Sequence, residues 1–232
     1  MPTIATIRGT GNTMKTIKSM IDWKLLSGSH KWPGPEGGTC INEAAIVVAG
    51  LKYRAVGDVS DLPPCFSPVI GAYLIKLNDD MAYASRQRLI EFAPRLSGSA
   101  DSRDVEKRRL EYIVIETVRR IVSSAMDAAG LKTEAEKCRA VTTFAEATAW
   151  AAWAAEAAWA AWAAEETEAA EAARTARAAR TAKAAKAAEA AVDDACIEIV
   201  RGALYLGNQA PPIEVAQIKE RVARARSLEP TA

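Results

Sequence analysis

Four side chains in the first third of the chain have types that could carry out chemistry together. They are the only histidine, His30, and three residues that follow it, Cys40, Glu43 and Cys65. Two thiolates, an imidazole and a carboxylate are a suitable ligand set for Zn²⁺, the one cofactor that these residues imply. The same groups could instead supply a cysteine nucleophile, a histidine base and an acid.

The spacing of these residues does not choose between the two interpretations. The intervals are 10, 3 and 22 residues, and they match no standard zinc signature. Cysteines also serve as small buried packing residues beside an ordinary loop histidine. Zinc binding, thiol chemistry and core packing are therefore three open alternatives, and the residues do not decide whether the chain is an enzyme.

A loop and a short helix must position the first three of these side chains. Residues 27–38 are rich in Gly, Pro and Ser, which predicts a loop carrying the histidine. Thr39 is a suitable N-cap, and residues 40–49 predict a helix that ends at Gly50 in the C′ position. The first cysteine and the carboxylate then share one helical face.

The last of the four residues also comes just before a predicted helix. Ser67 and Pro68 form an N-cap and N1 pair that opens a helix to about Leu77. Helix N-termini favour negative charge, so we expect lowered pKa values for the thiols of Cys40 and Cys65.

Further helices complete the predicted head. Residues 85–92 predict a short helix closed by Pro94, and residues 103–129 predict a periodic helix that ends at Gly130. The apolar stripe of this second helix contains Leu110, Val114, Thr117, Val118, Ile121 and Ala125. No convincing set of strands is present, so we expect an all-α fold with a compact head of short helices.

Alanine dominates the second half of the chain. Of 49 alanines, 27 fall within residues 145–191, and alanine is the best helix former. Thr133 and Glu136 fit a capping box, after which no Gly or Pro occurs for 65 residues. We predict one helix over residues 131–201, on the order of 100 Å long, which is either straight or bent near Asp193.

Composition divides the chain into four predicted parts. A flexible N-terminal arm covers residues 1–20, and a helical head domain covers residues 21–130. The long Ala/Trp-rich helix covers residues 131–201. A loop and a short C-terminal helix cover residues 202–232.

A nine-residue repeat places tryptophans within the alanine-rich segment. The motif Trp-Ala-Ala-Trp-Ala-Ala-Glu begins at Trp150 and again at Trp159, so its other tryptophans are Trp153 and Trp162. Nine residues turn a helix by about 180° beyond whole turns, which puts the two pairs on opposite faces. This geometry is unsuited to a membrane surface and favours a coiled-coil-like helix between two packing surfaces. Those surfaces belong either to the chain's own head or to a partner.

Charge disfavours nucleic acid as a partner. Lys and Arg number 30 against 29 Asp and Glu, so the formal net charge is +1. The basic residues within 174–186 recur every three positions and wind around a helix instead of forming one stripe. A solvated helix surface is therefore favoured over a nucleic-acid interface, both there and at residues 219–226.

The sequence predicts a cytoplasmic protein with no membrane contact. Residues 1–20 contain no apolar run of the signal-peptide type. Glu156 interrupts the longest apolar stretch, residues 147–164. None of the four cysteines belongs to a Cys-x-x-Cys pair, so we expect reduced thiols.

Several short motifs in the head resemble a group of uncharacterised bacterial proteins. They are Gly38-Thr-Cys40-Ile-Asn-Glu43-Ala-Ala, Ala49-Gly50, Pro64-Cys65-Phe-Ser-Pro68 and Leu77-Asn78-Asp79. Members of this group join such a head to an Ala-rich tail that often contains Trp. The resemblance implies a bacterial origin but no activity, and it marks the four candidate ligands as a set worth testing.

Two functions follow from these patterns. The first is a non-enzymatic protein–protein interaction or assembly protein, which uses the four tryptophans to bind a protein partner or a second copy of itself. The alternative is a zinc-binding or thiol-dependent activity at the four head residues.

Overall fold

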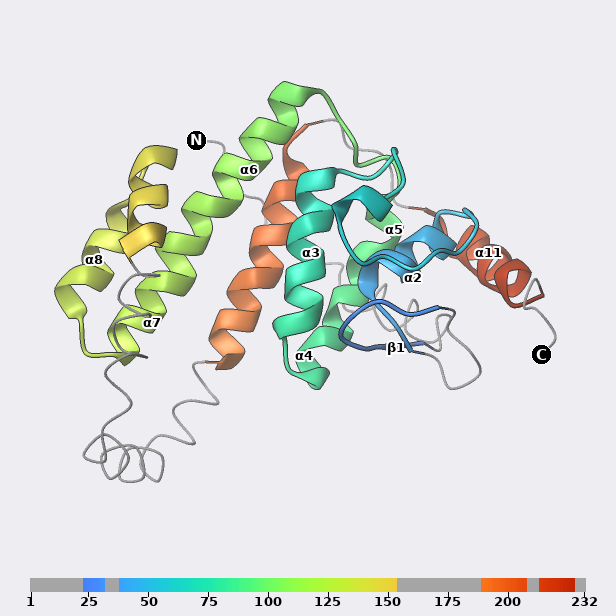
Figure 1. Cartoon of the computed structure of the whole chain (residues 1–232), viewed down its shortest axis with the longest axis horizontal. Helices are drawn as coiled ribbons and strands as arrows, with labels where there is room; N and C mark the ends of the chain where they lie inside the picture. The colour runs from blue at the N-terminus through green and yellow to red at the C-terminus, as the bar shows by residue number, and fades with distance from the viewer. Residues whose placement is uncertain (1–22, 32–37, 154–188, 208–212, 228–232) are drawn as a thin grey trace. The chain divides into compact units, whose positions relative to one another are not determined.

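The computed structural model describes residues 23–31, 38–153, 189–207 and 213–227 (Figure 1). These residues are mostly helical, with two very short strands, so the predicted all-α class is confirmed. None of the described helices has the length and apolar character needed to cross a membrane.

The described residues form two compact units. The first unit runs to Glu106 and resumes at Leu204, and the second unit is Lys107–Ala203. The predicted division of the chain into four parts stays a prediction. The predicted N-terminal arm, residues 1–20, lies outside the described residues.

Helix α2 (Ile41–Val48) is the centre of the first unit. All eight of its residues are buried, and only Asn42 and Glu43 among them are polar. Three helices pack around it (Figure 1): α3 (Pro68–Asp80), α5 (Ala93–Leu96) and α11 (Val215–Ser227). A helix buried on all sides needs the apolar composition that this one has.

Two short strands hold the histidine loop beside the start of α2. Strand β1 (Lys24–Leu25) pairs in parallel with β2 (Gly38–Thr39). The Gln87 side chain extends this pairing, because its Oε1 accepts from the Leu25 amide at 3.0 Å and its Nε2 donates to the Leu25 carbonyl at 2.8 Å.

The helix ends of the first unit agree with the sequence in some places and not in others. Ser67 caps α3 as predicted, since its Oγ accepts from the Ile70 amide at 3.2 Å. The predicted helix 85–92 closed by Pro94 is wrong. Helix α4 (Tyr83–Arg86) leads into the 3-10 helix η2 (Gln87–Phe92), which continues into α5. Pro94 lies in the first turn of α5, where no amide donor is lost.

One long helical stretch of the chain contains a π segment. Helix α6 (Arg103–Thr117) continues through η3 (Val118–Val122) into α7 (Ser123–Ala128). Gly130, with φ +83°, ends it as predicted. The predicted apolar stripe is partly wrong, because Leu110 is 44% exposed whereas Arg109 is fully buried. A buried arginine occupies a position that hydropathy assigns to solvent.

The predicted helix over residues 131–201 is wrong in its first part. Helix α8 (Lys132–Ala140) ends at Val141, whose backbone is extended, and a separate helix covers residues 144–153. Residues 154–188 lie outside the described residues. The helix at residues 189–205 is continuous through Asp193, which is buried, so no new helix begins there.

The capping box is present ten residues later than predicted. The Glu146 amide donates to Thr143 Oγ1 at 3.3 Å, and Glu146 Oε2 accepts from the Thr143 amide at 3.0 Å. Thr133 instead lies inside α8, whose N-cap Leu131 makes no side-chain capping bond.

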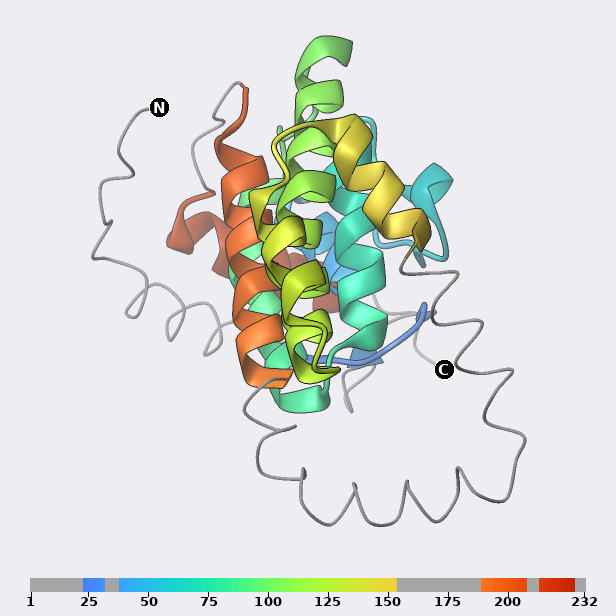
Figure 2. The same ribbon diagram turned by 90° about the vertical axis from the view of Figure 1, so that its left-hand side faces the viewer.

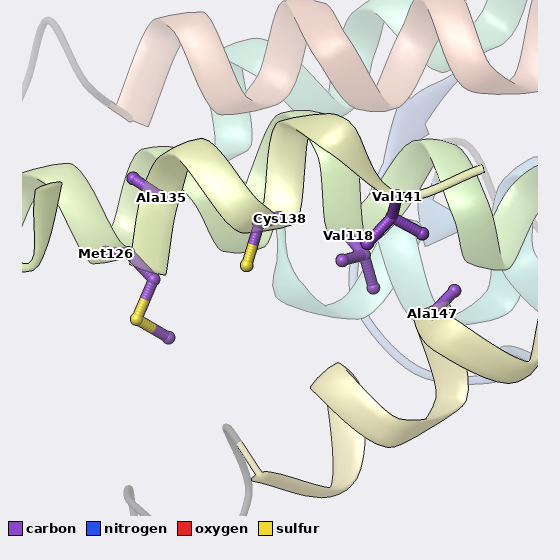
Figure 3. Close-up of a cluster of buried hydrophobic side chains, with 6 residues drawn as sticks. All are labelled: Val118, Met126, Ala135, Cys138, Val141 and Ala147. Carbon is purple, nitrogen blue, oxygen red and sulfur yellow. The ribbon is translucent and has the colours of Figure 1, made fainter. Parts of the chain in front are cut away.

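Helices α7 and α8 of the second unit pack against each other, next to each other in Figure 1 and overlapping in the view of Figure 2. Together with η3 and the helix at residues 144–153 they contribute to an apolar cluster (Figure 3), which contains Val118, Met126, Ala135, Cys138, Val141 and Ala147. Cys138 is thus a packing residue.

Candidate functional site

Glu43 is the centre of a buried polar network at the start of α2. It is fully buried, and it forms a capping box with Cys40. The Glu43 amide donates to Cys40 Sγ at 3.4 Å, and the Cys40 amide donates to Glu43 Oε2 at 2.8 Å. Cys40 is therefore the N-cap, with sulfur in place of the usual hydroxyl oxygen. The predicted N-cap, Thr39, instead donates its hydroxyl to Glu43 at 3.3 Å.

The Glu43 carboxylate joins separate segments of the chain. Its Oε1 accepts from the amides of His30 at 2.8 Å and Val56 at 3.0 Å. The Ser29 hydroxyl donates to the same oxygen at 3.4 Å. A buried carboxylate is costly unless its oxygens are hydrogen bonded. Both oxygens of this carboxylate accept hydrogen bonds. These bonds hold the loops that contain His30 and Val56 against the first turn of α2.

His30 is held by the same carboxylate. Its Nδ1 lies 3.2 Å from Glu43 Oε2, and its side chain is 20% exposed. The Tyr53 hydroxyl donates to the His30 carbonyl oxygen at 2.9 Å. Gly38 leaves room for the ring, because a Cβ at that position would come within 3.3 Å of His30 Cδ2.

The electrostatics of the network oppose thiolate chemistry. Burial, and then the neighbouring Glu43 carboxylate, raise the pKa of the Cys40 thiol to about 12. The same two causes raise the pKa of the Tyr53 hydroxyl. The lowered pKa predicted for Cys40 is therefore wrong, because desolvation and an adjacent negative charge outweigh the helix N-terminus. Near neutral pH this thiol is protonated and is a poor nucleophile.

His30, Cys40 and Glu43 lie close together, but the four predicted zinc ligands are not arranged around a metal site. Across the described residues, no group of three or more His, Cys, Asp and Glu side chains is arranged to hold a metal ion. Cys65 is half-buried, and its carbonyl accepts from the Ala100 amide at 3.1 Å. Of the other three residues, Glu43 has both oxygens engaged and Cys40 holds its proton. The geometry does not support the predicted zinc site.

Asn78 is a buried polar residue of this region that sequence reasoning missed. Its Oδ1 accepts from the Ile41 amide at 3.2 Å, and its Nδ2 donates to the Leu26 carbonyl at 2.7 Å. Tyr53 and Val56 were also missed. Val56 takes part through its backbone amide, which no residue type reveals in a sequence. For Asn78, the Leu77-Asn78-Asp79 motif is the one sequence signal that could have pointed to its side chain.

Half of the predicted interaction residues lie in the described part of the second unit. Trp150 and Trp153 are on the helix at residues 144–153, with ring centroids 5.3 Å apart and planes at 79°. Trp150 packs on the apolar cluster of Figure 3, whereas Trp153 is 39% exposed. Trp159 and Trp162 lie outside the described residues.

Comparison of the chain with family models, with curated proteins and with solved structures finds no match. The resemblance of the head motifs to a bacterial group stays a prediction, and function is argued from geometry alone.

Proposed function

We propose that this chain is a protein-interaction or assembly protein and that the helix at residues 144–153 is its contact surface. The single observation that carries the proposal is the exposure of this helix. Ala147 is its one buried residue, and Trp150 is half-buried. The exposed side chains include Phe144 at 37% and Trp153 at 39%. Exposed aromatic side chains on an apolar surface are typical of protein interfaces.

The rest of the helix surface suits close packing against another helix. Half of its exposed residues are alanines, and Glu146 is the one charged residue within 144–153. Small side chains let two helix axes approach to about 8 Å. Such a contact would desolvate almost no charge, so most of the buried area would contribute favourably.

The partner that we propose is a second copy of this chain. An apolar, nearly uncharged helix face is complementary to itself across a two-fold axis. The formal net charge of +1 gives little repulsion between copies. We place this assembly in the cytoplasm, and the four free cysteines support that placement.

Sedimentation velocity of the full chain and of Trp153→Ala tests the proposal. We expect the wild type to sediment at a multiple of 24.8 kDa, and the substitution to weaken association at least tenfold, since aromatic anchors dominate interface energies. Tyr83→Ala is the matched control, because Tyr83 is 50% exposed and lies on α4 in the other unit.

A wild type that stays monomeric up to millimolar concentration would exclude self-association. Equal behaviour of Trp153→Ala and Tyr83→Ala would exclude this helix as the interface. The double variant Trp159→Ala/Trp162→Ala extends the same measurement to the second copy of the repeat.

A further inference from the structure

The two ring nitrogens of His30 have different environments. Nδ1 lies 3.2 Å from Glu43 Oε2. Nε2 makes no hydrogen bond to any residue that the structure describes. The backbone of His30 is fixed on both sides of the ring's attachment point, because its amide donates to Glu43 and its carbonyl accepts from Tyr53.

Glu43 fixes the position of the imidazole proton. Its Oε2 accepts from the Cys40 amide and from the Thr39 hydroxyl. Because both Glu43 oxygens already act as acceptors for N–H and O–H groups, the geometry assigns Nδ1 as the donor in the contact with His30. In the neutral ring the lone pair is then on Nε2.

The His30 ring is partly open to solvent. The His30 side chain is 20% exposed, whereas the carboxylate behind it is completely buried. Gly38 contributes no side chain next to this edge, where a Cβ would lie 3.6 Å from Nε2. The nearby Cys40 thiol is not the group that His30 would deprotonate. Cys40 is buried, and its Sγ accepts a hydrogen bond from the Glu43 amide.

We propose that His30 is a general base for the hydroxyl or thiol group of a small molecule, with Glu43 as its positioning residue. The O–H or S–H bond breaks, its proton moves to Nε2, and the electron pair stays on the oxygen or sulfur. The ring becomes positively charged, and the carboxylate 3.2 Å away stabilises that charge. This proposal is independent of the interaction surface on the second unit.

Because His30 is the only histidine, long-range ¹H–¹⁵N NMR of the full-length protein reads its tautomer directly. We expect the neutral ring to carry its proton on Nδ1 and none on Nε2. Most free histidine has the opposite tautomer, so a proton found on Nε2 would overturn the proposal.

Carbethoxylation by diethyl pyrocarbonate measures the reactivity of the same nitrogen. Nε2 attacks a carbonyl carbon and forms an N–C bond, while ethyl hydrogen carbonate leaves with the Nδ1 proton and decomposes to ethanol and CO₂. We expect a rate at least one third of that of N-acetylhistidine at the same pH, and a lower rate would contradict an accessible base. His30→Gln, which keeps the backbone contacts, is the control for reaction at other residues.

Discussion

At the scale of single residues, Glu43 determines how the head is organised. Its two oxygens accept from the amides of His30, Cys40 and Val56. The same charge, together with burial, keeps the Cys40 thiol protonated. A residue that looks like a zinc ligand or a catalytic acid in the sequence is therefore a buried acceptor that joins loops.

Glu43→Gln tests this role. One amide nitrogen would replace an oxygen that faces N–H donors, so buried donors would lose their acceptor. We expect the free energy of unfolding to fall by about 3 kcal/mol, measured by urea denaturation at pH 7.

Asp80→Asn is the control for the Glu43 substitution. Asp80 accepts from Lys76 at 3.0 Å in an exposed ion pair, and such pairs contribute under about 1 kcal/mol. Similar losses in the two variants would contradict the role of Glu43 as the centre of the network.

At the scale of elements, two similar threonine–glutamate pairs near the start of the alanine-rich segment could each form the N-terminal capping box of a helix. Thr133 and Glu136 have the same types and spacing as Thr143 and Glu146. Only the second pair forms the capping box, because α8 already begins at Lys132. Ala147, one turn into the capped helix, is fully buried in the apolar cluster. Packing of that helix thus favours the break after Ala140.

Thr143→Ala and Thr133→Ala are a matched pair of substitutions. Removal of a real N-cap costs about 1 kcal/mol, whereas a threonine inside a helix is replaced by a better helix former. We expect the first variant to be destabilised by that amount and the second to be neutral or slightly stabilised, as measured by thermal unfolding. The reverse order would place the cap at Thr133.

At the scale of the whole molecule, the C-terminal helix α11 packs on α2 within the first unit. Arg221 Nη1 donates to the Val48 carbonyl at 2.8 Å, across 173 residues of sequence. This bond satisfies a carbonyl at the end of α2. The Ile213 amide also donates to the Pro94 carbonyl at 3.2 Å. The C-terminal helix is therefore part of the head and not an appendage.

Ile218→Ala tests that conclusion. Ile218 is completely buried on α11, so its truncation should lower the free energy of unfolding by about 3 kcal/mol. Lys219→Ala, at the exposed neighbouring position, should change it by under about 0.5 kcal/mol. Equal effects in urea denaturation would show that α11 does not belong to the core.

The sequence by itself determined the features that depend on near neighbours. The all-α class, the Ser67 cap and the glycine ends at Gly50 and Gly130 all follow from local backbone preferences. A cap or a glycine C′ residue acts within one turn of its own position, so its signal is present in a few consecutive letters.

Only the tertiary structure decided what the chemically suggestive residues do. Two of the donors to Glu43 are the backbone amides of His30 and Val56, each 13 residues away along the chain, and amides look alike in any sequence. The raised pKa of Cys40 is a consequence of burial and a nearby carboxylate. A histidine, a thiol and a carboxylate can surround a metal ion or bind one another. Which of the two occurs depends on the distances between their side chains in the folded protein, and the spacing of the residues along the chain does not give those distances.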